Sequence, residues 1–160
     1  MAGDPNRQTP SLLYAVKRLE LVIRAHLDDL LRGSGVTTLQ YTALTVLERR
    51  DGVTAAQLAR DSFVTPQTMA DMVRALEQRR LIRRAANPDN KRELLIYLTD
   101  GGRSFLAEFA GAVGALEDRM VSGFSPDQIE DFRTTLTTAW ITMTSSRGRP
   151  ELRRRGRRGR

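Results

Sequence analysis

The chain contains no cysteine and only one histidine, His26, among its 160 residues. Without cysteine there are no disulfides, no thiolate metal sites and no cysteine-based redox switch. A single histidine also excludes a histidine-rich metal site. The sequence therefore predicts no cofactor, and it argues against an enzyme because no nucleophile–base pair or metal set can be assembled from its residues.

Long apolar runs are also missing from the sequence. No stretch approaches the ~20 apolar residues that a membrane-spanning helix requires, and residues 1–10 lack the apolar core of a signal peptide. With 40% hydrophobic and 28% charged residues, the composition is typical of a globular domain. We expect a cytoplasmic protein without a membrane partner.

The formal net charge of +7 is concentrated at the C-terminal end. Residues 147–160 hold eight of the 26 basic residues and one of the 19 acidic residues, so the remaining chain is neutral. We expect this Arg-rich tail, like the polar lead of residues 1–10, to be disordered. Three roles stay open for the tail: an inert solubilising end, a tether to phosphates beside a DNA site, or binding of RNA or lipid.

Within the neutral remainder, residues 74–92 form a locally basic block. The block contains seven basic residues and two acidic residues, Glu77 and Asp89, which gives it a net charge of +5. A local block of this kind is better evidence for a phosphate-facing surface than the overall isoelectric point. Its basic members are Arg74, Arg79, Arg80, Arg83, Arg84, Lys91 and Arg92.

Apolar periodicity predicts four helices outside the centre of the chain. The first covers Leu12 to Leu31 and ends at residues 33–35, and the second runs from about Leu39 to Arg49. The second helix should bury Leu39, Ala43, Leu44 and Leu47. Two long helices close the chain, the second of which opens with a capping box at residues 125–128. We expect Trp140 and the phenylalanines of these helices to lie in a core or an interface.

The centre of the chain predicts two short capped helices. Thr54 and Gln57 form a capping box for a helix that ends near Asp61. Thr65 and Pro66 then supply the N-cap and the first residue of the next helix. This second helix should bury Met69, Met72, Val73 and Leu76. At about 100° per residue, its opposite face then carries a polar stripe made of Gln67, Asp71, Arg74 and Gln78.

Two strands follow, over Ile82 to Ala86 and Glu93 to Leu98. The turn between them consists of Asn87, Pro88, Asp89 and Asn90, and it is followed at once by Lys91 and Arg92. Two helices followed by a basic hairpin predict a mainly α fold, a winged helix-turn-helix with a two-stranded β-wing. That arrangement places one helix in the major groove of DNA and a basic loop beside it.

These elements, in this order, resemble the MarR family of bacterial transcription regulators over about Leu12 to Met143. The most specific part is Pro88 to Gly102, which is close to the family's DPxDRRxxxLxLTxxG wing pattern. The resemblance implies an obligate homodimer that binds a palindromic operator in double-stranded DNA, one winged lobe on each half-site. Many such proteins repress a promoter and release it when a small molecule binds between the dimer and DNA lobes.

The resemblance also implies a division of the chain and a set of DNA contacts. Residues 11–35 and 103–146 would form the helical dimerisation region, and residues 36–102 the winged DNA-binding domain. The helix from Thr65 to Arg79 would be the recognition helix, and Arg92 the wing arginine that enters the minor groove, with Lys91 as its basic neighbour. The predicted DNA contacts are Thr65, Gln67, Thr68, Asp71, Arg74, Gln78, Lys91 and Arg92.

Three residues depart from the family pattern. Asn90 replaces an acidic residue of the wing, so the ion pair expected to brace the wing is in question. Asp71 stands where a basic or neutral residue is more common; its carboxylate can accept from cytosine N4 but repels phosphate. Arg80 replaces a glycine after the recognition helix, and we expect strain of about 1 kcal/mol if the backbone there has a positive φ.

Two questions remain open at the level of sequence. Tyr14 and Tyr41, with His26, either line a pocket for a small aromatic or phenolic effector or serve as packing and surface residues. The alternative function is a winged-helix protein–protein interaction module whose basic tail binds RNA or another acidic partner. An exposed apolar wing would favour that alternative, whereas the wing tip here is polar and basic.

Overall fold

The computed structural model describes residues 10–146, which fall into two compact units divided after Leu116. The expectations for residues 1–9 and for the Arg-rich tail lie outside the described residues. Among the described helices, none combines the length and the apolar character needed to cross a membrane.

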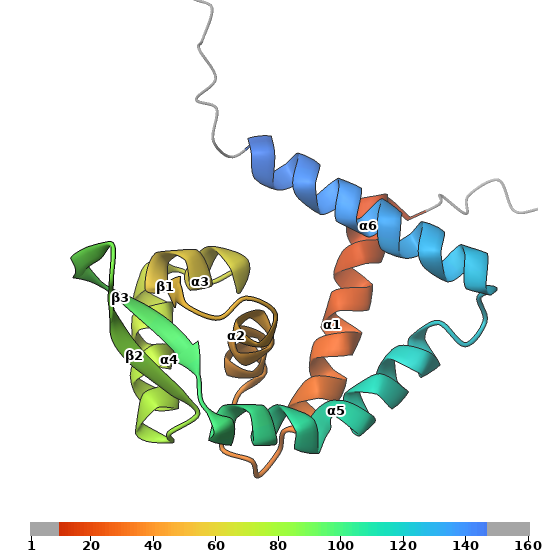
Figure 1. The fold of residues 1–160 in the computed structure, drawn as a ribbon. Helices are drawn as coiled ribbons and strands as arrows, with labels where there is room; N and C mark the ends of the chain where they lie inside the picture. The colour runs from red at the N-terminus through yellow and green to blue at the C-terminus, as the bar shows by residue number, and fades with distance from the viewer. Residues whose placement is uncertain (1–9, 147–160) are drawn as a thin grey trace, which may run out of the picture. The chain divides into compact units, whose positions relative to one another are not determined.

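The first unit combines helices with one small antiparallel sheet (Figure 1). The helix α5 continues past the division at Leu116, and α6 lies entirely in the second unit. In chain order the elements are α1 (Leu12–Leu30), α2 (Thr38–Arg49), β1 (Val53–Thr54), α3 (Ala55–Asp61), α4 (Pro66–Gln78), β2 (Ile82–Asn87), β3 (Asn90–Leu98), α5 (Asp100–Met120) and α6 (Pro126–Ser146).

The sheet has three strands in the order β1-β3-β2. The predicted hairpin is confirmed, since β2 and β3 pair with Ile82 opposite Leu98 and turn through Pro88 and Asp89. The sequence did not predict β1, which adds a third strand by pairing Val53 with Ile96. A two-residue strand is too short to show alternation, so periodicity gives no sign of it.

The core of the first unit lies among α2, α3, α4 and the sheet. All four residues predicted to be buried on α4 are buried, and so are three of the four on α2. Leu39 is the exception, being 38% exposed in the first turn of α2, while Tyr41 enters the core instead. The side chains without measurable exposure include Leu44, Leu47, Leu58, Met69 and Leu76.

The helices α3 and α4 end in the same way, in a Schellman motif closed by a non-glycine residue. After α3, the Val64 amide donates to the Ala59 carbonyl at 3.0 Å, and Phe63 adopts φ +59°. After α4, the Leu81 amide donates to the Leu76 carbonyl at 3.0 Å, and Arg80 adopts φ +60°. The condition for strain at Arg80, a positive φ, is therefore met.

A tight junction connects the wing to α5. Thr99 alone separates β3 from α5; its hydroxyl donates to the Arg80 carbonyl at 2.6 Å and accepts from the Gly102 amide at 3.0 Å. A Cβ on Gly102 would lie 2.2 Å from the carbonyl oxygen of Leu81. The first turn of α5 therefore packs directly on the chain that leaves α4, and only glycine fits at position 102.

The helices α1 and α6 are amphipathic without being buried. No residue of α1 is buried, and Leu12, Leu13, Val16 and Val22 are each more than half exposed. In the second unit, α6 opens with the predicted capping box: the Gln128 amide donates to Ser125 Oγ, and the Ser125 amide donates to Gln128 Oε1. Its large apolar residues Leu136, Trp140, Ile141 and Met143 are all exposed.

Candidate nucleic-acid interface

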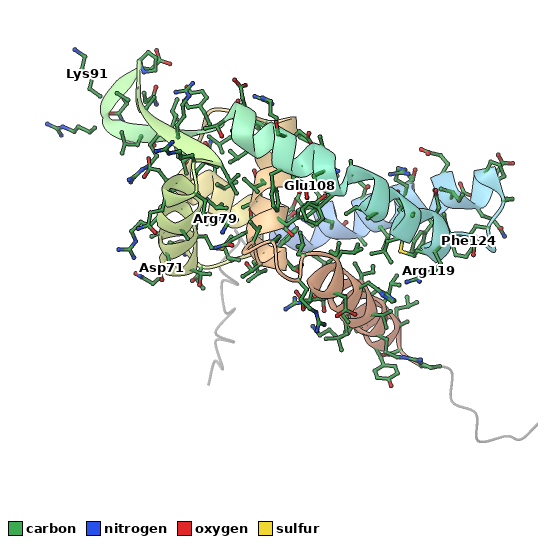
Figure 2. The ribbon with its side chains drawn as sticks, turned by 90° about the horizontal axis from the view of Figure 1, so that it is seen from below. Asp71, Arg79, Lys91, Glu108, Arg119 and Phe124 are labelled. Carbon is green, nitrogen blue, oxygen red and sulfur yellow. The ribbon has the colours of Figure 1, made fainter. Side chains whose placement is uncertain are left out.

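The exposed face of α4 carries the predicted polar stripe. Gln67, Asp71, Arg74 and Gln78 are all exposed, while the four apolar residues on the opposite side are buried. Figure 2 shows Asp71 pointing outward from this helix. The amphipathic pattern thus fixes which side of α4 is available to a partner.

The N-terminal end of α4 is held by the two threonines predicted there. Thr65 is the N-cap: its Oγ1 accepts from the Thr68 amide at 3.1 Å and lies 2.9 Å from Thr68 Oγ1. Pro66 occupies the first helical turn, where a missing N–H costs nothing. The first turn of α4 therefore presents a rigid, polar end, with Thr65 exposed and Thr68 half-buried.

Asp71, which departs from the family pattern, has a hydrogen-bond partner on the same helix. Its carboxylate accepts a hydrogen bond from Arg74 Nη2, three residues further along the same helix. Both side chains are well exposed, so the pair contributes little to folding. The carboxylate of Asp71 also offsets part of the positive charge of Arg74 on this face of α4.

The wing turn is braced by asparagine side chains. Asn87 Oδ1 accepts from the Asp89 amide at 3.0 Å, and its Nδ2 donates to Glu93 Oε2 at 2.9 Å. Asn90 Oδ1 accepts from the Arg92 amide at 3.2 Å, so an Asx-type hydrogen bond stands where the family pattern suggested an ion pair. The brace leaves Lys91 and Arg92 exposed, and Lys91 extends from the hairpin tip in Figure 2.

A cleft of about 690 Å³ lies between α4 and the wing. Gln67 and Arg74 of the polar stripe line it together with Arg92 of the wing, so residues far apart in sequence share one concave surface. The apolar residues that line it are Ala55, Ala56, Ala70, Val73, Leu94 and Ile96.

Arg84 also lines this cleft, although the sequence indicated it only as part of the basic block. Its guanidinium donates twice to Glu77 Oε2, at 3.0 and 2.5 Å, and so ties β2 to α4. This hydrogen bond lowers the pKa of Glu77 below the ordinary 4.5 and raises the pKa of Arg84. The pairing of Arg84 with Ile96 across the hairpin places it here, and no local pattern reveals that pairing.

The three residues considered for an effector pocket lie in different environments. Tyr41 is 8% exposed in the core, and burial is the first cause that raises the pKa of its phenol, followed by Glu48. Tyr14 is 55% exposed on α1, and the Arg18 guanidinium lies 5.7 Å from its ring. His26 is half-buried on α1. Tyr41 therefore fits the alternative of a packing residue. An effector role for any of the three residues stays a prediction.

Between residues 10 and 146, no three histidine, aspartate or glutamate side chains come together as metal ligands would. The interface consists instead of a capped helix with an exposed polar face, a basic hairpin and a cleft between them. This combination defines a winged helix-turn-helix protein.

Comparison with known proteins shows a similarity to one family. Residues 34–93 match the family model described as MarR family. The chain is 29% identical over 123 residues to an HTH-type transcriptional repressor of Mycobacterium tuberculosis, a match that covers 77% of this chain and 88% of that protein. The chain is thus similar to MarR family proteins in sequence.

Two solved structures illustrate the similarity. A MarR family regulator from Silicibacter pomeroyi has a TM-score of 0.75 at 25% identity, covering 81% of this chain and 88% of its own. The transcriptional repressor CouR, bound to a 23-mer DNA duplex, has a TM-score of 0.71 at 26% identity, covering 87% and 99%. The fold class predicted from sequence is confirmed.

Proposed function

We propose that this chain is a sequence-specific DNA-binding transcriptional regulator, a repressor that binds a palindromic operator as a homodimer. The observation that carries the proposal is the cleft in which Gln67 and Arg74 of α4 meet Arg92 of the wing. It joins a base-reading helix to a phosphate-binding hairpin on one surface. The similarity to repressors, one of them solved on DNA, supports the same function.

In this proposal the residues that contact DNA have different roles. Gln67 offers an amide that can pair with both N6 and N7 of adenine, worth about 1–3 kcal/mol of discrimination. Lys91 and Arg92 contribute charge to phosphates or to the minor groove. Arg74 lines the cleft and donates a hydrogen bond to Asp71, so it would bring a partly neutralised positive charge to the DNA. Thr65, Thr68 and Gln78 complete the contact surface of α4.

The apolar residues left uncovered on α1 and α6 support a homodimer. Side chains such as Leu13, Val16 and Trp140 are about half exposed or more, which is costly for helices in water. We propose that a second copy of the chain covers them, and that residues 11–35 and 103–146 form the dimerisation region. Two lobes would then meet half-sites about 34–36 Å apart.

Release of DNA by a small aromatic or phenolic effector is the finer part of the proposal. A ligand that favours one spacing of the two lobes over another shifts the population away from the DNA-binding form. Tyr14, His26 and Tyr41 remain the candidate contacts.

A gel shift with the DNA upstream of the protein's own gene tests the proposal. We expect a discrete complex that outcompetes scrambled DNA and weakens in about 300 mM salt. Equal affinity for both sequences would contradict the regulator. The protein–protein alternative is not favoured, because the wing tip is polar and basic rather than apolar.

A further inference from the structure

The turn between α3 and α4 contains an aromatic residue in a conformation that suits glycine. Phe63 has φ +59° and is 70% exposed. A bulky residue in the left-handed region costs about 1–2 kcal/mol relative to its usual conformation. The exposed ring gains little from packing in return, so folding alone does not account for a phenylalanine at this position.

The backbone around Phe63 holds that conformation firmly. The Phe63 amide donates to the Arg60 carbonyl at 3.3 Å, and the next amide, of Val64, donates to Ala59 at 3.0 Å. These two bonds make Phe63 the C′ residue of the Schellman motif that ends α3. The backbone at Phe63, and with it the direction of the Cα–Cβ bond, is therefore set by the turn.

The position of Phe63 relates it to the proposed DNA surface. It lies two residues before Thr65, the N-cap of α4, and helices of this class contact base edges with their N-terminal residues. Its exposed neighbours are polar or basic: Arg60 on one side, Thr65 and Gln67 on the other. Such flanks suit a phosphate-bearing partner better than an apolar protein surface.

We infer that Phe63 is a specificity-determining residue whose ring packs on the 5-methyl group of a thymine in the operator. This methyl group is the apolar feature of the major groove that a phenylalanine can read. The inference rests on the proposed function. It adds an apolar contact to a surface that otherwise reads DNA through amide and charged groups.

The test compares the full-length chain with Phe63→Gly and Phe63→Asn on a duplex that the wild-type chain selects from a random-sequence pool. Glycine and asparagine accept a positive φ, so both variants should unfold at the same temperature as the wild type or higher. Both should bind the selected duplex about tenfold more weakly, because burial of much of an aromatic ring is lost.

Replacing single thymines of that duplex with deoxyuridine removes one methyl group at a time. The wild-type chain should lose about fourfold in affinity at one thymine in each half-site, and the two variants should lose nothing there. Arg80→Gly is the matched control: it relieves the same backbone strain at the other end of α4 and should keep the wild-type response to deoxyuridine.

The outcomes distinguish a failure of the proposed function from a failure of the thymine contact. If the wild-type chain selects no sequence, the proposed function fails. If it selects one but the Phe63 variants bind it as tightly, or respond to deoxyuridine as the wild type does, the thymine contact is overturned while the regulator stands.

Discussion

Arg79 Nη2 donates a hydrogen bond to the carbonyl oxygen of Ser34 at 2.6 Å. The contact joins the C-cap of α4 to the segment between α1 and α2, across 45 residues of chain. Arg79 is labelled at the end of α4 in Figure 2. It passes directly over Gly35, where a Cβ would lie 2.4 Å from Arg79 Nη1.

This geometry predicts that Gly35→Ala is more destabilising than Gly33→Ala. Both glycines have positive φ, +73° and +83°, so each substitution carries a similar backbone cost of about 1–2 kcal/mol. Only at Gly35 must the Arg79 guanidinium move and lose its bond to Ser34, because nothing lies within 4 Å of a Cβ at Gly33. We expect an additional loss of about 0.5–1.5 kcal/mol in urea unfolding.

Repeating the two substitutions in an Arg79→Ala background supplies the control. Without the guanidinium, the two alanine variants should be equally stable. A difference that persists would show that the Gly35 effect arises from the backbone and not from Arg79.

A second prediction concerns Ser62, which is 1% exposed and whose Oγ has no hydrogen-bond partner among residues 10–146. A buried hydroxyl without a partner costs free energy that a methyl group does not. Ser62→Ala should therefore raise the free energy of unfolding by about 1 kcal/mol, measured by urea denaturation. Ser122→Ala is the comparison, because Ser122 Oγ is exposed and donates to the Arg119 carbonyl; no gain is expected there.

The ion pair between Glu77 and Arg84 predicts a pH dependence. Because Arg84 lowers the pKa of Glu77 below 4.5, the pair contributes stability above that pH and loses it as the pH falls through the lowered value. Both side chains are more than one-third exposed, so the contribution is a few tenths of a kcal/mol.

Glu77→Gln should thus be less stable than the wild type at about pH 7, and the difference should shrink as the pH falls from 4.5 toward about 3. Thermal unfolding at both pH values measures the difference. A gap of the same size at low pH would mean that the side chain acts through packing and not through its charge.

The two proposed kinds of DNA contact should respond differently to substitution. Arg92→Ala should weaken binding to operator and scrambled DNA alike and reduce the salt slope by about 2 for a dimer, one for each wing. Gln67→Ala should lose operator preference and leave the slope unchanged. Binding titrations at several salt concentrations distinguish them, with Arg32→Ala, which removes an exposed arginine paired to Asp29, as the charge control.

The elements that the sequence predicts well are those with local signals. Thr54 and Thr65 mark helix starts through their own hydrogen bonds, and the spacing of Met69, Met72, Val73 and Leu76 identifies the buried side of α4. The positive φ of Arg80 was also predictable, because the family pattern has glycine at that position.

What the sequence does not reveal depends on distant partners. Val53 forms a strand only because Ile96 lies beside it, and Arg84 enters the cleft through its register in the hairpin. Leu39 fits the apolar period of α2, yet it is 38% exposed, whereas Tyr41 is buried. Phe63 gives no local sign of a left-handed conformation, since glycine is the usual signal for it.

The junction at Thr99 and Gly102 has a consequence for how the protein transmits movement. A single residue lies between β3 and α5, and the Leu81 carbonyl lies close to Gly102. The connection between the hairpin and the helix is therefore short and tightly packed. Any tilt that a bound duplex imposes on the hairpin must turn the first residues of α5 by a comparable amount. A longer or looser connection, such as a glycine inserted after Thr99, would uncouple the two.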